Sequence, residues 1–389
     1  MNAEDIKQSD LNDRLLLWSF CAMFFFLPIA TSPAVISGMI SLGIWVFSGQ
    51  LMRDRHEWTK QAWFKPVVLL ILLPWIGLLW TDDIHSGLRF AKKSYYWLYA
   101  FAILSVCHIY SPKILINSFL AGLSLTVIIS MLQYVEVIPM PKGYPAGFMG
   151  HIVYSLLLVY GILLLSFYYR EAKLKKHRVA IMVLIAAYVF SLSVNTGRIG
   201  YFAFAFLSPW ILYNLLGRKH IIIFVVSVSA LIMLLSLSPT VQNRSKIAVD
   251  EIKEYYNGDK NTSIGRRFHM WEGAIKMFME NPVMGVGTGG YAIEMKKYRD
   301  APDLPEYFSH PHNSFLYMAT SYGIIGLVIF IWLLAVFFRK GWRARTTMEG
   351  FSILSFGAVL LIGSMTDTQM MSLTTGNIFA LLVGLRSKG

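Results

Sequence analysis

Long apolar stretches dominate the hydrophobic pattern of this chain, and polar residues gather in the segments between them. A transmembrane helix needs about 20 mostly apolar residues, because the bilayer interior offers no water to open backbone groups. We therefore expect an all-α polytopic membrane protein of about twelve transmembrane helices. The predicted spans are residues 15–30, 33–51, 66–80, 95–109, 114–137, 151–169, 179–193, 201–216, 221–237, 314–338, 350–365 and 377–385.

The connection between residues 237 and 314 is much longer than the others, at about 75 residues. Apolar residues recur at helical spacing in 245–256 and 268–280, which predicts two or more amphipathic helices there. Loops of this length in folded proteins are usually functional or disordered, and the periodicity favours function. We divide the chain into residues 1–237 with nine spans, a loop domain at 238–313, and residues 314–389 with three spans.

Composition supports the membrane interpretation. Apolar residues form 56% of the 389 residues and charged residues only 15%, against roughly 25% charged residues in soluble domains. These values exclude disordered, collagen-like and disulfide-scaffold classes. The two cysteines, Cys21 and Cys107, lie within apolar stretches, and we expect them to be buried and inert.

Basic residues predict the orientation of the spans. With a cytoplasmic N-terminus, the inside loops hold 20 Lys and Arg and the short outside loops hold 5, with the long loop left out. Both termini are therefore predicted to be cytoplasmic, with the loop domain outside. The first span is predicted to be a retained signal anchor, with cleavage near residues 30–34 as the alternative. Because topology accounts for much of the net charge of +13, no nucleic-acid partner is needed.

Arginines facing the outer compartment are the first candidates for binding an anion. The loop domain holds ten basic and ten acidic residues, so an anion site there depends on a few placed side chains. Arg266 and Arg267 begin an amphipathic helix, and Arg198 lies in a very short turn at the outer membrane edge. Together Arg198 and Arg267 are suited to hold a diphosphate. The alternatives are solvated arginines or, for Arg198, a side chain snorkelling to headgroups.

Two histidines precede the tenth span. His310 and His312 flank Pro311, and Asn313 follows. A histidine of near-neutral pKa is the usual general base for a hydroxyl group, and a neighbouring amide or carboxylate fixes its tautomer. A pair at i and i+2 is also compatible with a metal, but neither a cysteine nor a recognised ligand spacing accompanies it, so we expect no metal site.

Other polar or glycine-rich segments are assigned structural roles. Residues 285–290 (GVGTGG) lack the lysine and the βαβ context of a nucleotide loop, and we expect a tight turn that lets chain segments approach closely. The aspartates at 82–83 are expected to cap a loop. Arg89, Lys92 and Lys93 nearby are candidate contacts to phosphate or headgroups.

Four ordered segments resemble the superfamily of O-antigen ligases and O-antigen polymerases. They are residues 265–271 (GRRFHMW), 281–287 (NPVMGVG), 310–316 (HPHNSFL) and 323–327 (GIIGL). Arg198 in its short loop, residues 147–154, and the layout of spans with one large outer loop agree with the family, so the resemblance covers most of the chain.

The resemblance implies a GT-C-like, inverting glycosyltransferase in the inner membrane of a Gram-negative bacterium. The implied donor is an O-antigen linked to undecaprenyl diphosphate, and the implied acceptor is lipid A-core at the periplasmic face. No metal or other cofactor is implied, and the partners are these glycolipids and membrane lipids. Carried over to this sequence, the diphosphate contacts are Arg198 and Arg267, and the catalytic base is His312. Further candidates for the site are Arg266, His310, Asn313 and Arg89.

Four other functions compete with the ligase. An O-antigen polymerase differs in its acceptor, and a protein O-oligosaccharyltransferase is expected to carry further C-terminal sequence. A transporter or flippase for lipid-linked glycans predicts charged residues deep in the spans and an internal repeat, and we find neither in the sequence. A structural scaffold leaves the gathering of Arg198, Arg267 and His312 at one face unexplained.

Overall fold

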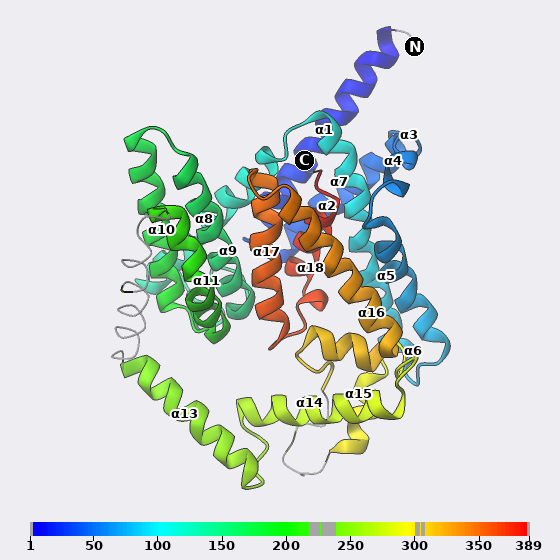
Figure 1. Cartoon of the computed structure of the whole chain (residues 1–389), viewed down its shortest axis with the longest axis vertical. Helices are drawn as coiled ribbons and strands as arrows, with labels where there is room; N and C mark the ends of the chain where they lie inside the picture. The colour runs from blue at the N-terminus through cyan, green and yellow to red at the C-terminus, as the bar shows by residue number, and fades with distance from the viewer. Residues whose placement is uncertain (1–2, 218–225, 227–238, 300–303, 305–307, 387–389) are drawn as a thin grey trace.

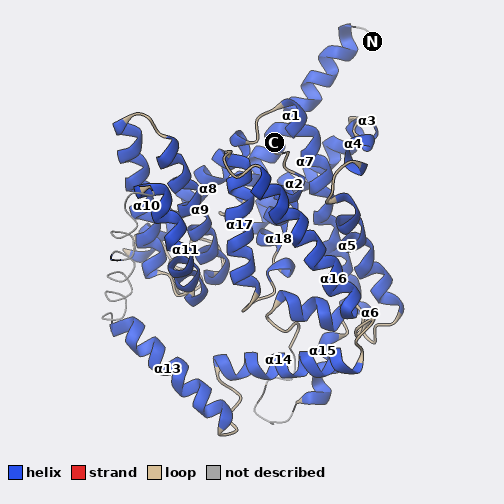
Figure 2. Cartoon of the chain, in the orientation of Figure 1, coloured by secondary structure: helices blue, strands red, loops and turns tan. Residues whose placement is uncertain are grey.

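The computed structural model describes residues 3–217, 226, 239–299, 304 and 308–386. All regular structure in these residues is helical, which confirms the all-α prediction (Figure 2). The predicted ninth span, 221–237, lies outside the described residues apart from Val226.

The other predicted spans correspond in order to helices of the structure. Their bounds are α1 (Ala3–Phe26), α2 (Thr31–Phe47), α5 (Phe64–Ile76), α7 (Leu98–Ile109), α8 (Lys113–Tyr134), α9 (His151–Glu171), α10 (Lys175–Val194), α11 (Arg198–Leu216), α16 (Ser314–Arg343), α17 (Met348–Ser364) and α18 (Leu373–Gly384). Short helices between them are α3 (Gln50–Arg53), α4 (Arg55–Thr59) and α6 (Ile84–Lys92).

Fewer helices than the predicted twelve are long and apolar enough to span a bilayer. Among the described residues five meet both conditions, and four shorter apolar helices accompany them. The fourth predicted span is shortened because its beginning forms a 3-10 helix, η2 (Lys93–Trp97), before α7. The third contains Pro74 inside α5 and ends in the 3-10 turn η1 (Gly77–Leu79).

Helix α9 forms the centre of the bundle. Its apolar window is 78% buried, the highest share among the five long helices. It packs against α8, α10, α11 and α17, which leaves almost none of its middle turns at the surface. A helix that is apolar on all sides is expected at such a buried position.

Helix α16 is broken, which corrects the prediction of one continuous span at 314–338. Gly323 has φ 62° and ψ −157°, outside helical geometry. An added Cβ atom there would lie 2.2 Å from the carbonyl oxygen of Val283, so both conformation and space require glycine. The first arm lies across the end of the bundle, and the second arm continues into it at an angle (Figure 1).

Residues 282–288 of the loop domain pass beside the break in α16 and connect the loop domain to the bundle. The amide of Ile324 donates to the carbonyl oxygen of Pro282 at 2.8 Å, and the amide of Val286 donates to that of Thr320 at 2.8 Å. The amide of Thr288 donates to the carbonyl oxygen of Gly77 at 3.1 Å, next to α5. The prediction that residues 285–290 form a close-packed turn is confirmed.

The loop domain is helical and lies at one end of the bundle. Helices α13 (Pro239–Tyr256) and α14 (Ser263–Glu280) contain the two predicted amphipathic segments, and the short α15 (Tyr291–Met295) follows. The buried face of α14 includes Ala274 and Met277, which pack with Tyr291 and Met295. The start of α1 and the end of α18 lie at the opposite end of the bundle from α14 (Figure 1).

Candidate active site

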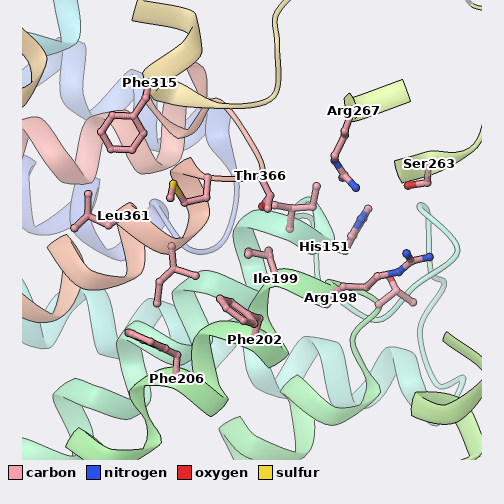
Figure 3. A pocket seen from close by; sticks show the side chains of 14 residues that line it. His151, Arg198, Ile199, Phe202, Phe206, Ser263, Arg267, Phe315, Leu361 and Thr366 are labelled. Carbon is pink, nitrogen blue, oxygen red and sulfur yellow. The ribbon is translucent and has the colours of Figure 1, made fainter. Parts of the chain in front are cut away.

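A cavity of about 820 Å³ opens between the bundle and α14. One part of it is polar, and the rest is lined by aliphatic and aromatic side chains from α11 and α17. Figure 3 shows the side chains of Arg198, Arg267 and His151 grouped in one part of the cavity, with Phe206 and Leu361 further away. The lining residues are His151, Ile152, Thr196, Arg198, Ile199, Phe202, Phe206, Ser263, Arg267, Phe315, Leu361, Ile362, Met365 and Thr366.

Helix starts hold the two arginines of this cavity. Arg198 is the first residue of α11, and the side chain of Asn195 fixes the preceding turn by accepting the amide of Gly197 at 2.7 Å. Arg267 lies in the second turn of α14, whose first turn is capped by Thr262 accepting the amide of Gly265 at 3.0 Å. The structure therefore brings into one cavity two arginines that are 69 positions apart in the sequence.

Neither guanidinium has a hydrogen-bond or ion-pair partner within the part of the chain that the structure describes. Burial lowers the pKa of Arg267, and the charge of Arg198 lowers it further, while Asp367 and Glu251 act in the opposite direction. Two unpaired cations in a cavity with apolar walls favour a ligand that carries more than one negative charge.

Arg266 points to a different environment from Arg267. It is exposed, and its Nε donates to the side-chain oxygen of Asn261 at 2.8 Å. Arg266 does not line the cavity. The sequence did not distinguish between these two arginines. In the structure Arg267 lines the cavity and Arg266 lies at the surface.

His312 is held by a carboxylate. Its Nδ1 lies 2.9 Å from Oδ1 of Asp367, which follows α17. His312 has φ 47°, a conformation uncommon for any residue other than glycine and often found at functional sites. Its side chain is 37% exposed, so the imidazole is accessible while the carboxylate orients it.

Asn313 has a structural role in this arrangement. Its side-chain oxygen accepts the amides of Phe315 and Leu316 and caps α16, and its Nδ2 donates to the carbonyl oxygen of Met365 at 3.1 Å. The partner of the His312 ring is thus Asp367, not the neighbouring amide.

His310 lies beside His312, with ring centroids 4.3 Å apart. Its Nδ1 is 3.1 Å from the hydroxyl oxygen of Thr368 and accepts the amide of His312 at 3.3 Å. Burial lowers the pKa of His310 to about 4, and the charge of His312 acts in the same direction. His310 is therefore neutral at neutral pH and cannot balance an anion.

Asp367 remains ionised at neutral pH. Burial acts to raise its pKa, but the hydrogen bond and charge of His312, the charge of His310 and the amide of Thr368 outweigh burial and lower the pKa. The carboxylate can therefore orient the His312 ring and stabilise its protonated form.

His310, His312 and Asp367 also offer one ligand atom each within 4.8 Å of one another, a set that could hold a metal ion. This grouping was not expected from the sequence. However, Nδ1 of His312 and Oδ1 of Asp367 already face each other at hydrogen-bond distance.

Residues 365–368 separate the first cavity from a second one. Met365 and Thr366 line the first cavity, whereas Asp367 and Thr368 line a cavity of about 510 Å³. Arg89 lies in this second cavity. It is therefore not in the cavity of Arg198 and Arg267, with which the sequence had grouped it.

Two residues of the site were missed from the sequence. Asp367 is a single acidic residue just after the eleventh predicted span. Its predicted position at the same membrane face as the histidines could have identified it as a partner for one of them. His151 begins α9 and lies next to Arg267 in the first cavity (Figure 3). His151 belongs to residues 147–154, which the sequence analysis uses only for the family resemblance.

A family model and a curated relative of this chain both carry the description O-antigen ligase. Residues 180–331 match the family model described as O-antigen ligase. An O-antigen ligase of Salmonella typhimurium is 25% identical over 271 residues, which cover 64% of this chain and 61% of that protein. A Haemophilus influenzae protein with no assigned function is 25% identical over 176 residues, or 42% of this chain and 44% of that protein. This chain thus spans less than two thirds of either relative.

Proposed function

We propose that this multi-pass membrane chain, whose residues 180–331 match the family model described as O-antigen ligase, is an O-antigen ligase. In this proposal the protein moves O-antigen polysaccharide from undecaprenyl diphosphate to lipid A-core at the periplasmic face of the inner membrane, with both termini cytoplasmic. The observation that carries the proposal is the cavity with two unpaired arginines at its polar part and apolar walls elsewhere.

The first cavity is proposed to bind the donor. The guanidinium groups of Arg198 and Arg267 bind the diphosphate and neutralise the charge that grows on it as the glycosidic bond breaks. Apolar side chains of α11 and α17, including Phe202 and Ile362, contact the isoprenoid units next to the diphosphate. Fixed cations in a partly desolvated site stabilise this leaving group more strongly than cations in water would.

His312 is proposed to be the catalytic base. Its Nδ1 is engaged by Asp367, so Nε2 remains to accept the proton of the acceptor hydroxyl. The hydroxyl oxygen then forms a bond to the anomeric carbon while the bond to the diphosphate oxygen breaks. A displacement in one step inverts the anomeric configuration. Asp367 acts as a positioning residue that stabilises the protonated His312 ring.

The test is a transfer assay with purified protein in nanodiscs, using undecaprenyl-diphosphate O-antigen and lipid A-core without nucleotide. We expect transfer in the wild type and a loss of roughly 10²- to 10⁴-fold in His312→Ala. Arg198→Ala and Arg267→Ala are each expected to lose roughly 10²- to 10³-fold. Arg266→Ala is the matched control, because Arg266 lies outside the cavity, and it should retain activity.

Addition of EDTA tests metal independence. We expect full activity with the chelator, because Asp367 supports His312 directly without a metal. Loss of activity with EDTA and its return with a divalent ion would replace the base mechanism by one that uses His310, His312 and Asp367 as metal ligands.

The same assay separates the ligase from its competitors. Extension of the donor glycan without transfer to lipid A-core would identify a polymerase, and transfer to a serine-containing protein acceptor would identify an O-oligosaccharyltransferase. Movement of the donor across the bilayer without transfer to any acceptor would favour a transporter. Equal activity of wild type and His312→Ala would remove the assignment of the base.

A further inference from the structure

The second cavity is lined by Asp367 and Thr368, which directly follow the residues Met365 and Thr366 that line the cavity of the arginine pair. It has a volume of about 510 Å³ and is formed by α6, η2, residues 309–310 and the segment that follows α17. Its lining is mostly polar and contains His310, Asp367 and Thr368 as well as two cations, Arg89 and Lys93. The proposed donor site does not use this cavity.

Both cations are positioned by the fold. Asp83 caps α6 by accepting the amide of Ser86 at 2.9 Å, and Nη2 of Arg89 donates to the hydroxyl of Ser86 at 3.1 Å. Lys93 follows at the start of η2, with its Nζ 5.5 Å from the centroid of the Phe90 ring. Arg89 and Lys93 therefore approach the cavity from one short, amphipathic segment.

Lys93 is the more buried of the two cations. It is half-buried and has no hydrogen-bond or ion-pair partner in the residues that the structure describes. Burial lowers the pKa of its ammonium group, and its charge contributes to the lowered pKa of His310. A half-buried cation without a partner is costly, and an anion that enters the cavity would offset this cost.

Asp367 does not serve as that anion. Its Oδ1 accepts from the amide of Thr368 at 2.9 Å and faces His312, and its Oδ2 accepts from Nε2 of Gln369 at 3.2 Å. Asp367 also lines the second cavity, but within the described residues its carboxylate forms no ion pair with Arg89 or Lys93. Arg89 and Lys93 are therefore available to an anion that enters the cavity.

We propose that this second cavity binds a phosphate group of the acceptor glycan, through Arg89 and Lys93. The proposal rests on the proposed function, because it concerns the acceptor of the same reaction. The acceptor would then reach His312 from one side of residues 365–368, while the donor diphosphate is held by Arg198 and Arg267 on the other. This division matches a displacement in which the nucleophile and the leaving group lie on opposite faces of the anomeric carbon.

The experiment measures transfer kinetics in nanodiscs made only of zwitterionic lipid. Two acceptors are compared, namely lipid A-core with its phosphates and the same material after phosphatase treatment. For Arg89→Gln and Lys93→Gln we expect the KM of the phosphorylated acceptor to rise roughly 10- to 100-fold, as for the loss of a charge-assisted hydrogen bond. The KM of the donor should not change, and with the dephosphorylated acceptor both variants should match the wild type.

Lys92→Gln is the matched control. Lys92 is adjacent to Lys93 and carries the same charge, but it is exposed and does not line the cavity. We expect its kinetics to equal those of the wild type with both acceptors. An equal effect of Lys92→Gln and Lys93→Gln would mean that general surface charge, and not a built site, attracts the acceptor.

Two further outcomes would overturn the proposal. Equal impairment of both acceptors in Lys93→Gln would remove phosphate recognition. An effect that arises only after anionic phospholipid is added would assign the cavity to a membrane headgroup.

A binding measurement keeps the inference separate from the proposed function. Phosphorylated lipid A-core is expected to raise the melting temperature of the wild type and of His312→Ala, but not that of Lys93→Gln. If the wild type transferred no glycan, the proposed function would fail, and this binding result would still decide the inference. Equal stabilisation of wild type and Lys93→Gln would refute the inference alone.

Discussion

Trp271 donates its indole N–H to the carbonyl oxygen of Pro311 at 2.9 Å. Trp271 lies on α14 one turn after Arg267, and Pro311 directly precedes His312. This bond therefore connects the helix that carries a proposed diphosphate contact to the segment that carries the proposed base. Because the relative placement of reacting groups controls rate strongly, we expect this bond to affect the rate of transfer more than the stability of the fold.

Trp271→Phe should separate these two effects. The variant keeps an aromatic ring but loses the hydrogen bond, which contributes about 1 kcal/mol to stability. We expect a small decrease in melting temperature and a decrease in kcat of roughly tenfold, because the distance between Arg267 and His312 is no longer fixed. Thermal unfolding and transfer kinetics on the same preparation measure both. An unchanged kcat would show that α14 is positioned without this bond.

Asp367→Asn tests the carboxylate that supports His312. The amide has nearly the same shape but no charge, so it neither selects the same tautomer reliably nor stabilises the protonated ring. We expect kcat to fall roughly 10²- to 10⁴-fold, with little change in the KM of the donor. Asp250→Asn, at an exposed position of α13, is the control and should behave as the wild type. A KM effect without a kcat effect would assign Asp367 to binding.

Gly323→Ala tests the break in α16. Alanine at φ 62° is strained, and its Cβ would lie 2.2 Å from the carbonyl oxygen of Val283. We expect destabilisation by more than about 1 kcal/mol, seen as a lower melting temperature. Gly43→Ala is the matched control, because its Cβ would meet nothing within 4 Å in α2, and it should be neutral or slightly stabilising. Similar melting temperatures for the two variants would contradict the structural requirement for glycine at position 323.

His310 gives a dependence of stability on pH. Its pKa falls from the usual 6.5 to about 4 in the folded protein, mainly because burial disfavours the charged ring. The unfolded chain therefore binds a proton below pH 6.5 that the folded protein does not, and stability is lost as the pH falls from about 6.5 to about 4. The melting temperature of wild type should fall across this window more steeply than that of His310→Gln. Parallel curves would refute the assignment.

The order and positions of the helices were predictable because apolar residues mark them directly. Residues 151–169 and 179–193 correspond to α9 and α10 within a few positions. The break at Gly323 was not predictable, because the segment stays apolar on both sides of it. Next to the break, the amide of Ile324 donates to the carbonyl oxygen of Pro282, 42 positions earlier in the sequence, and no local pattern indicates this contact.

In the site, too, residue types were predictable from the local sequence, whereas contacts between distant residues were not. Arg198, Arg267 and His312 were selected from residue type, membrane face and family resemblance, and the structure brings both arginines to one cavity. The partner of His312 was not found, because Asp367 is 55 positions away and no local pattern connects them. Arg89 and Arg198 line different cavities, and no local pattern in the sequence indicates that they are separated.

The two arms of the broken α16 have different surroundings. Only its second arm, from Ile324 onward, continues into the bundle, whereas the first arm follows His312 and is fixed to residues 282–287. A span adapts to bilayer thickness by tilting, and a rigid helix of 30 residues would carry that tilt to its end. The break at Gly323 means that the histidine segment and the span beyond it are not parts of one rigid helix. We therefore expect the proposed chemistry to depend less on the thickness of the surrounding lipid than it would with one continuous helix.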